Sequence, residues 1–210
     1  MKKGIVFDLD GTLWDSSENV ALAYSEVMQR HGFGTLSRAG LKKLMGKTMD
    51  AIAEALFPSV GGEEREKLMD EAMENEEAVL RVKGGVLYPQ LEETLAELCR
   101  RWPLYIVSNC QCGYIETFYE AHGMEKYFSG KACYGEAKLP KAENIRLLAR
   151  RCALDRAVYV GDTLGDFEAA CGAGVPFIHA RYGFGDVAEA QYAIDSISEL
   201  PALAEAVLAD

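Results

Sequence analysis

The sequence lacks several features that mark whole classes of protein. No apolar run approaches the roughly 18 residues that a membrane-spanning helix needs. At the N-terminus, Lys2 and Lys3 precede only four apolar-type residues before Asp8, and no small-residue cleavage site follows, so the start does not resemble a secretory signal. We therefore expect neither a membrane-spanning segment nor a secreted protein.

Positive charge is scarcer than negative charge, and cysteine patterns typical of zinc sites are missing. The chain has 22 Lys and Arg residues against 33 Asp and Glu residues, and its net charge of −11 argues against nucleic acid or an anionic membrane as its main partner. Its six cysteines form no CxxC pair or zinc-type spacing, which predicts reduced thiols and a cytoplasmic location. Nothing in the sequence indicates an oligomeric state.

What the sequence does contain is an alternation of short apolar runs and longer amphipathic segments. Hydrophobic residues make up 49% of the 210 residues, enough for a sizeable core. The runs predict strands at Gly4–Phe7, Leu104–Val107, Lys131–Tyr134, Val158–Val160, Pro176–His179 and Tyr192–Ile194. The other segments predict helices at Leu91–Arg101, Tyr114–Ala121, Ala142–Cys152, Phe167–Ala173 and Glu199–Leu208. This pattern indicates an α/β fold with a doubly wound parallel sheet.

The segment between the first two predicted strands departs from this alternation. Residues 16–83 show helical periodicity without a convincing strand, and glycine and proline breaks divide them into about four helices. Within them, the charge-rich segment Glu63–Glu77 is expected to be a solvated helix face. We expect residues 16–83 to form a helical subdomain inserted into a core made of residues 1–15 and 84–210.

Polar residues follow several of the predicted strands. Their sequences are Asp8-Leu9-Asp10-Gly11-Thr12, Ser108-Asn109, and Gly161–Asp166, with Lys138 and Lys141 near the end of another strand. Ligands of open parallel sheets gather outside the carboxyl ends of the strands. We therefore expect these residues to share a site.

The chemistry of these residues favours a hard metal ion and a phosphoryl group. Asp8 and Asp10 can face the same side of the strand end, where they need a cation, and Asp162 offers a further oxygen ligand. No histidine lies in these loops, so Mg²⁺ is expected rather than zinc. Lysine, hydroxyl and backbone N–H groups beside such an ion suit phosphoryl transfer.

In its motifs, the chain resembles the haloacid dehalogenase superfamily, in particular its phosphoglycolate-phosphatase-like and β-phosphoglucomutase-like branch. The motif DxDGT is present as Asp8–Thr12, an apolar strand ends in Ser108, a lysine precedes a helix, and GDxxxD is present as Gly161–Asp166. Motif order and the helical insertion match along essentially the whole chain. The resemblance implies a Rossmann-like core, with residues 16–83 as a mobile helical cap.

The resemblance also implies a role for each aspartate. Asp8 would be the nucleophile and a ligand of Mg²⁺. Asp10 would be the general acid and then the general base, with its backbone carbonyl on the metal. Asp162 would bind Mg²⁺, and Asp166 would do so directly or through water.

The remaining matches concern the substrate. By the same resemblance, Thr12 would support the site and Asp10, and Ser108 and Asn109 would hold phosphoryl oxygens. The usual Lys-Pro step is absent, and we choose Lys141 as the phosphate lysine because it precedes the helix Ala142–Cys152, with Lys138 as the alternative. Gly46-Lys47-Thr48 resembles the cap loop that reaches substrates in this branch, so Lys47 would bind substrate.

The function expected from this resemblance is a Mg²⁺-dependent phosphatase of a small phosphorylated metabolite, acting through an aspartyl-phosphate. A β-phosphoglucomutase-like phosphomutase is the main alternative, since it uses the same residues. A dehalogenase fits less well, because that reaction has no use for Asp10 or the metal. A non-catalytic module that binds a phosphorylated ligand is the alternative of a different class.

Overall fold

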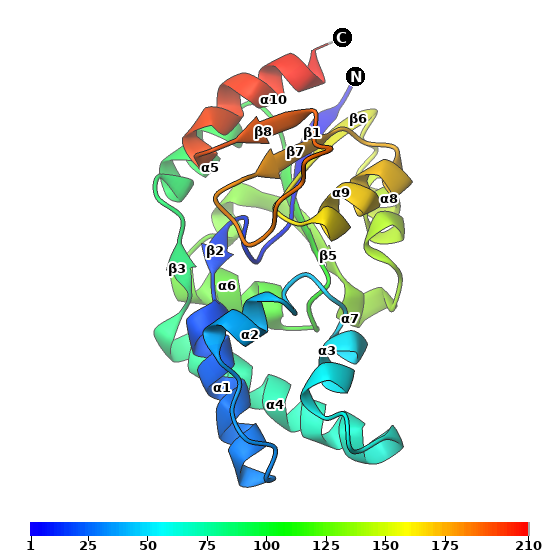
Figure 1. Ribbon diagram of the computed structural model, residues 1–210. Helices are drawn as coiled ribbons and strands as arrows, with labels where there is room; N and C mark the ends of the chain where they lie inside the picture. Colours follow the sequence, from blue (N-terminus) through cyan, green and yellow to red (C-terminus); the bar gives the residue numbers. More distant parts are fainter. Residues whose placement is uncertain (210) are drawn as a thin grey trace.

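The computed structural model describes residues 1–209 and has an α/β core with a helical subdomain at one end (Figure 1). Its main sheet has six parallel strands in the order β5-β4-β1-β6-β7-β8. The strands are β1 (Lys3–Phe7), β4 (Leu104–Ser108), β5 (Phe128–Cys133), β6 (Arg156–Gly161), β7 (Phe177–Ala180) and β8 (Tyr192–Ile194). The predicted doubly wound parallel sheet is thus confirmed.

Both faces of the sheet are buried because successive apolar side chains of a strand point to opposite sides. In β1, Ile5 and Phe7 join one hydrophobic cluster and Val6 joins the other. The first cluster includes residues of α5 (Leu91–Leu98), α6 (Tyr114–His122) and α10 (Leu200–Leu208), and the second those of α8 (Lys141–Arg151) and α9 (Leu164–Ala173). Helices therefore cover the sheet on both sides.

Several predicted boundaries were wrong, among them those of β5 and the start of α9. The structure begins β5 at Phe128 and places Tyr134 in α7 (Tyr134–Ala137), because β5 is an edge strand whose half-buried residues form no continuous apolar run. Helix α9 begins at Leu164 rather than at Phe167. Its first turn is fixed by hydrogen bonds between Thr163 and Asp166, a polar signal that apolar periodicity does not detect.

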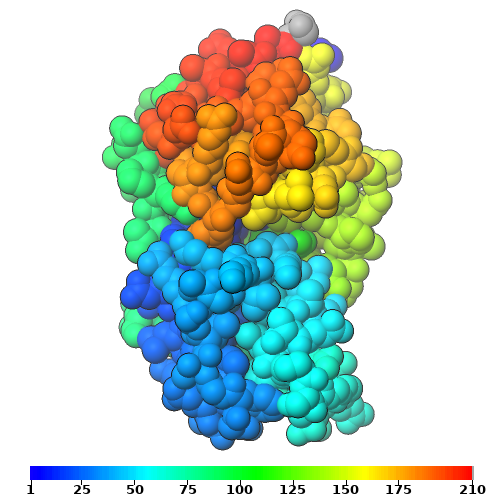
Figure 2. Space-filling model, viewed as in Figure 1, coloured from blue at the N-terminus to red at the C-terminus, as the bar shows by residue number. Residues whose placement is uncertain are grey.

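The inserted segment is helical, as predicted. Residues 16–83 contain no strand and form four helices, α1 (Ser17–Arg30), α2 (Arg38–Lys42), α3 (Met49–Leu56) and α4 (Gly62–Lys83). These helices, the cap, lie at the end of the molecule opposite both termini (Figure 1). The cap packs against the core along a narrow seam (Figure 2).

The expectation of a solvated face for Glu63–Glu77 was wrong at one position. Glu76 is only 3% exposed, because it lies in the row of buried residues Leu68, Ala72, Glu76 and Leu80 that repeats every four residues along α4. The position of Glu76 in this apolar row could have indicated its burial from the sequence. The prediction missed it because it considered only the high charge of the segment.

The chain crosses between core and cap twice, and the two crossings pair with each other. The short strands β2 (Trp14–Asp15) and β3 (Val86–Leu87) are antiparallel. Two residues are too few for a strand pattern to be visible in the sequence. Two single turns of 3₁₀-helix, Glu125–Tyr127 and Ile197–Glu199, complete the fold. None of the helices in residues 1–209 combines the length and apolar character needed to cross a membrane.

Phe118 of α6 offers a test of the core beside these crossings. It is fully buried, with its ring centroid 5.1 Å from that of Trp14. We expect Phe118→Ala to lower the free energy of unfolding by about 3–5 kcal/mol through the cavity that it leaves. Val82→Ala, at a side chain 85% exposed, should change it by no more than about 0.5 kcal/mol. Urea unfolding measures both, and equal small losses would contradict the packing described.

Candidate active site

The site lies where the order of the strands reverses. Strand β1 has β4 on one side and β6 on the other, so the carboxyl ends of these three strands are neighbours. Asp8 follows β1, Ser108 ends β4 and Asp162 follows β6. Parallel pairing therefore brings together residues separated by up to about 150 positions, at the edge where open α/β sheets bind ligands.

Three buried carboxylates meet at this edge. Asp8, Asp162 and Asp166 each offer an oxygen, and these oxygens all lie within 4.8 Å of one another. Like charges this close repel strongly in a buried site. A set of carboxylate oxygens without histidine or cysteine is the donor chemistry of Mg²⁺ and similar hard cations, so the residues present fit such an ion.

Lys141 is the cation of the cluster. Its ammonium group donates hydrogen bonds to Asp8 Oδ1 at 2.9 Å and to Asp166 Oδ1 at 2.6 Å, from a side chain buried at the first residue of α8. Burial and the Asp166 carboxylate raise the pKa of Asp8 to about 7, while Lys141 acts in the opposite direction. The Lys138 ammonium lies elsewhere, 5.1 Å from the centroid of the Tyr134 ring.

Asp166 binds Lys141 and also fixes the start of α9. Its Oδ2 accepts hydrogen bonds from the backbone N–H and the hydroxyl of Thr163, at 3.0 and 2.7 Å, and the Thr163 hydroxyl accepts one from the Asp166 N–H in return. Burial would raise the pKa of Asp166, but Lys141 and these donors outweigh it and lower that pKa. Asp166 therefore remains a carboxylate.

Asp162 is held by two loops. Its Oδ1 accepts from the Thr12 hydroxyl at 3.4 Å and its Oδ2 from the Phe184 N–H at 2.7 Å. Thr12 thus contacts Asp162 rather than Asp10. Gly11 has a φ of +85°, and a Cβ there would overlap the Asp162 carboxylate, so only glycine permits this approach.

Asp10 has a separate set of partners. Its Oδ1 accepts hydrogen bonds from Trp14 Nε1 at 3.0 Å, the Ser16 hydroxyl at 2.6 Å and the Tyr114 hydroxyl at 2.9 Å. Burial raises the pKa of Asp10, although these donors act against it. All three contacts fall on one oxygen, so the geometry holds the carboxyl in place. Sequence reasoning missed these partners, because nothing in it related Tyr114 to a residue 104 positions earlier.

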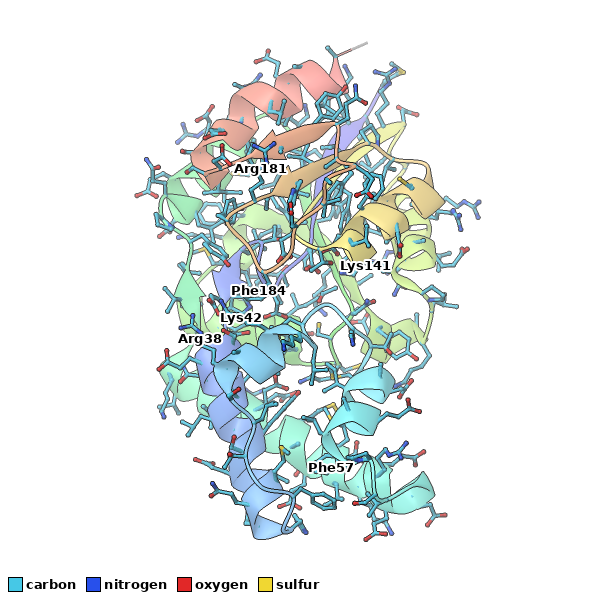
Figure 3. The ribbon with its side chains drawn as sticks, viewed as in Figure 1. Arg38, Lys42, Phe57, Lys141, Arg181 and Phe184 are labelled. Carbon is cyan, nitrogen blue, oxygen red and sulfur yellow. The ribbon has the colours of Figure 1, made fainter. Side chains whose placement is uncertain are left out.

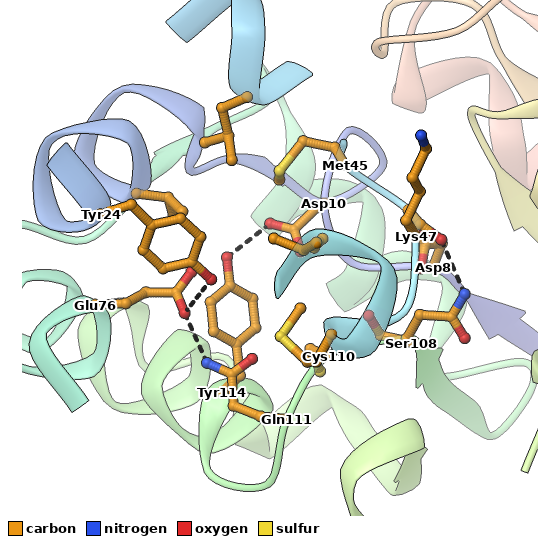
Figure 4. A pocket seen from close by; sticks show the side chains of 16 residues that line it. Asp8, Asp10, Tyr24, Met45, Lys47, Glu76, Ser108, Cys110, Gln111 and Tyr114 are labelled. Carbon is orange, nitrogen blue, oxygen red and sulfur yellow. Dashed lines mark hydrogen bonds between the residues drawn. The ribbon is translucent and has the colours of Figure 1, made fainter. Parts of the chain in front are cut away.

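Asp8 and Asp10 line a cavity of about 30 Å³ between core and cap (Figure 4). Ser108, Asn109 and Lys47 line it too. The Asn109 amide donates to the Gly46 carbonyl at 2.8 Å and thereby ties the cap loop 46–48 to the core. Within residues 1–209, the buried Asn109 Oδ1 has no hydrogen-bond partner.

The far end of the cavity holds a third carboxyl group, that of Glu76, which is buried. Glu76 Oε2 accepts hydrogen bonds from the Tyr24 hydroxyl at 3.1 Å and from Gln111 Nε2 at 2.7 Å (Figure 4). Burial raises the pKa of Glu76 to about 8, against the effect of both donors. Because Tyr24 and Glu76 come from the cap and Gln111 from the core, this group is a further contact between them.

Other contacts close the seam at its edges. The Tyr134 hydroxyl of the core donates to Asp50 of the cap at 2.7 Å. The Lys42 ammonium of α2 lies 4.7 Å from the ring centroid of Phe184, in the loop that also binds Asp162 (Figure 3). The cap is therefore closed over the strand ends.

Comparison with known proteins places this arrangement in a family. The model of the haloacid dehalogenase-like hydrolases matches residues 5–180. A phosphoglycolate phosphatase of Vibrio cholerae serotype O1 is 30% identical over 197 residues, covering 87% of this chain and 85% of that protein. A phosphoglycolate phosphatase of Yersinia pestis is 28% identical over 190 residues, with coverages of 87% and 82%.

Solved structures share the fold. A predicted phosphoglycolate phosphatase from Haemophilus somnus superposes with a TM-score of 0.85 at 21% identity, covering 97% of this chain and 98% of that one. CbbY from Rhodobacter sphaeroides, solved with phosphate, gives a TM-score of 0.80 at 24% identity, with coverages of 95% and 96%. The predicted resemblance is confirmed, and the chain belongs to the haloacid dehalogenase-like hydrolase family.

Proposed function

We propose that the protein is a Mg²⁺-dependent phosphatase that hydrolyses a small phosphorylated metabolite through an aspartyl-phosphate on Asp8. The observation that carries the proposal is the buried cluster in which Lys141 bridges Asp8 and Asp166 beside Asp162. Phosphoryl transfer needs such a concentration of positioned charge. A phosphatase of this family also agrees with the curated phosphoglycolate phosphatases that the chain resembles.

Asp8 and Asp162 are the proposed carboxylate ligands of Mg²⁺, together with the backbone carbonyl of Asp10. Asp166 is proposed to interact with the ion directly or through a water molecule. Its Oδ1 already accepts a hydrogen bond from Lys141, and its Oδ2 accepts one at the N-terminus of α9. Bound there, the ion would neutralise the carboxylates and the phosphoryl oxygens. Nucleophilic attack and proton transfer are assigned to side chains of the protein.

In the first step, a carboxylate oxygen of Asp8 attacks phosphorus and the bond between phosphorus and the leaving oxygen breaks. Asp10 gives its proton to that oxygen, and the alcohol departs. In the second step, water attacks the aspartyl-phosphate while Asp10 takes a proton from it, which releases phosphate and restores Asp8. The hydrogen bonds from Trp14, Ser16 and Tyr114 keep Asp10 in position for both transfers.

The phosphoryl oxygens are proposed to bind Lys141, the Ser108 hydroxyl and the backbone N–H of Asn109. Lys47, on the exposed cap loop, would approach them from the other side. Residues 16–83 would act as the cap that opens for substrate, turning about the paired strands β2 and β3, and then excludes water. The Asn109–Gly46 hydrogen bond would form on closing.

The proposal is tested first with p-nitrophenyl phosphate. We expect wild-type protein to release phosphate with Mg²⁺, to stop in EDTA and to recover when Mg²⁺ is restored. Asp8→Asn should lose activity by about a thousandfold or more while keeping its melting temperature, because it lacks the nucleophile. Equally slow release by both proteins would refute the enzyme proposal.

The same preparation separates hydrolysis from phosphoryl transfer to a sugar. Incubated with glucose 1-phosphate, a phosphatase releases free phosphate, whereas a phosphomutase forms glucose 6-phosphate. Halide release from a haloacid without metal would instead indicate a dehalogenase.

The two candidate lysines differ in their expected effects. Lys141→Met removes the cation between Asp8 and Asp166, so kcat/KM for p-nitrophenyl phosphate should fall about a hundredfold or more. Lys138→Met, the matched control, should keep kcat/KM within about twofold, because its ammonium lies on Tyr134 outside the cluster. The reverse result would assign the role to Lys138. Loss of Lys141 should also lower stability, which thermal melting measures, because buried carboxylates lose their partner.

Two glycines test the close approach to Asp162. Gly11→Ala and Gly32→Ala both place a side chain at positive φ, at a cost of about 1–2 kcal/mol each. Only at Gly11 does the new Cβ meet Asp162, since nothing lies within 4 Å of one at Gly32. We expect Gly11→Ala to raise the Mg²⁺ concentration for half-maximal activity about 10- to 100-fold. Equal Mg²⁺ dependence in the two variants would show that Asp162 does not hold the metal.

A further inference from the structure

One buried ionisable group in the cavity has no part in the proposed reaction. Glu76 lies at the end away from Asp8, with both of its hydrogen-bond donors, Tyr24 and Gln111, on one oxygen (Figure 4). Burying a carboxyl group is costly, and an apolar residue would complete the row on α4 at a lower cost. Glu76 therefore requires an explanation beyond packing.

The charges that line the cavity are unevenly placed. Its acidic lining residues are Asp8, Asp10 and Glu76, and Lys47 is the single cationic residue among those that line it within residues 1–209. The Lys47 ammonium points away from Glu76 (Figure 4). The end that faces Glu76 thus offers two carboxyl groups and no cation to a leaving group.

Much of the remaining lining of the cavity is apolar, and Gln111 adds a side-chain amide beside Glu76. Side chains of the cap contribute Val20, Leu41, Met45 and Ile52, and Tyr114 contributes its ring from the core. A leaving group with its own carboxylate, such as glycolate, would be desolvated between Asp10 and Glu76 without a counter-charge. The closed cavity of about 30 Å³ admits little more than a water molecule, so an alcohol would enter while the cap is open. A neutral alcohol can then donate a hydroxyl hydrogen to Glu76 and place its carbon atoms on the apolar side chains.

We propose that Glu76, held by Tyr24 and Gln111, is a specificity-determining residue that selects phosphomonoesters of small uncharged, hydroxyl-bearing alcohols and rejects those whose alcohol carries a carboxylate. This inference rests on the phosphatase proposal, since it needs the leaving group to lie beside Asp10. It also separates this chain in specificity from the phosphoglycolate phosphatases that it resembles.

The test compares kcat/KM for three small substrates that share the phosphoryl group and differ in the charge of the alcohol. These are glycerol 3-phosphate, 2-phosphoglycolate and phosphoethanolamine. We expect the wild-type enzyme to prefer glycerol 3-phosphate over 2-phosphoglycolate by about tenfold or more. Measured above pH 8, where Glu76 is ionised, this ratio should narrow about tenfold in Glu76→Gln, mainly because 2-phosphoglycolate is hydrolysed faster once the repulsion between the two carboxylates is removed.

Glu77→Gln is the matched control. It makes the same substitution at the next residue of α4, whose side chain is 26% exposed and does not line the cavity. It should leave the ratio of the two substrates unchanged. Should Glu76→Gln fail to fold, as judged by thermal melting, the wild-type ratio still tests the predicted preference, since a ratio that does not favour glycerol 3-phosphate contradicts it.

Two results would overturn the inference while leaving the phosphatase proposal intact. One is Mg²⁺-dependent turnover of p-nitrophenyl phosphate with 2-phosphoglycolate equal or preferred to glycerol 3-phosphate. The other is such turnover with phosphoethanolamine as the preferred substrate. Absence of any Mg²⁺-dependent turnover of p-nitrophenyl phosphate would instead remove both proposals together.

Discussion

The structure depends on the burial of several carboxylates where the central strands end. Asp8, Asp162 and Asp166 would repel one another there, and Lys141 supplies one positive charge among them. The local backbone serves this arrangement, since the turn at Gly11 leaves room for Asp162 and the first turn of α9 is closed by Asp166. A cluster with more negative than positive charge is suited to a divalent cation and a phosphoryl group, the chemistry of the family to which the chain belongs.

The cap changes the environment of this cluster rather than adding to it. Its helices close over the strand ends and meet the core through Asn109 and Gly46, Tyr134 and Asp50, and Glu76 and Gln111. These contacts are polar, and apolar side chains of the cap and the core also share one hydrophobic cluster. In the proposed reaction the core carries the groups that act on phosphorus, while the cap brings Glu76 and apolar side chains to the place where the alcohol would lie. The two proposals therefore assign the reaction to the core and the specificity to the cap.

Much of the fold was predictable because its signals are local. The apolar strands, the helical insertion and the polar residues that follow β1, β4 and β6 are all visible as short patterns. The errors arose where burial was incomplete or polar groups replaced the apolar pattern. The edge strand β5 lacked a continuous apolar run, and Glu76 looked solvated because its neighbours in sequence are charged.

The sequence by itself determined the parallel sheet, the inserted helices and the carboxylates at the strand ends, because spacing along one strand or helix decides which side chains share a face. The tertiary structure decided which partners those carboxylates have. It placed Lys141 rather than Lys138 between Asp8 and Asp166, Tyr114 on Asp10 across 104 positions, and Gln111 on Glu76 across 35. Such contacts join separate elements, and their geometry follows from how the sheet and the cap pack, which no local pattern records.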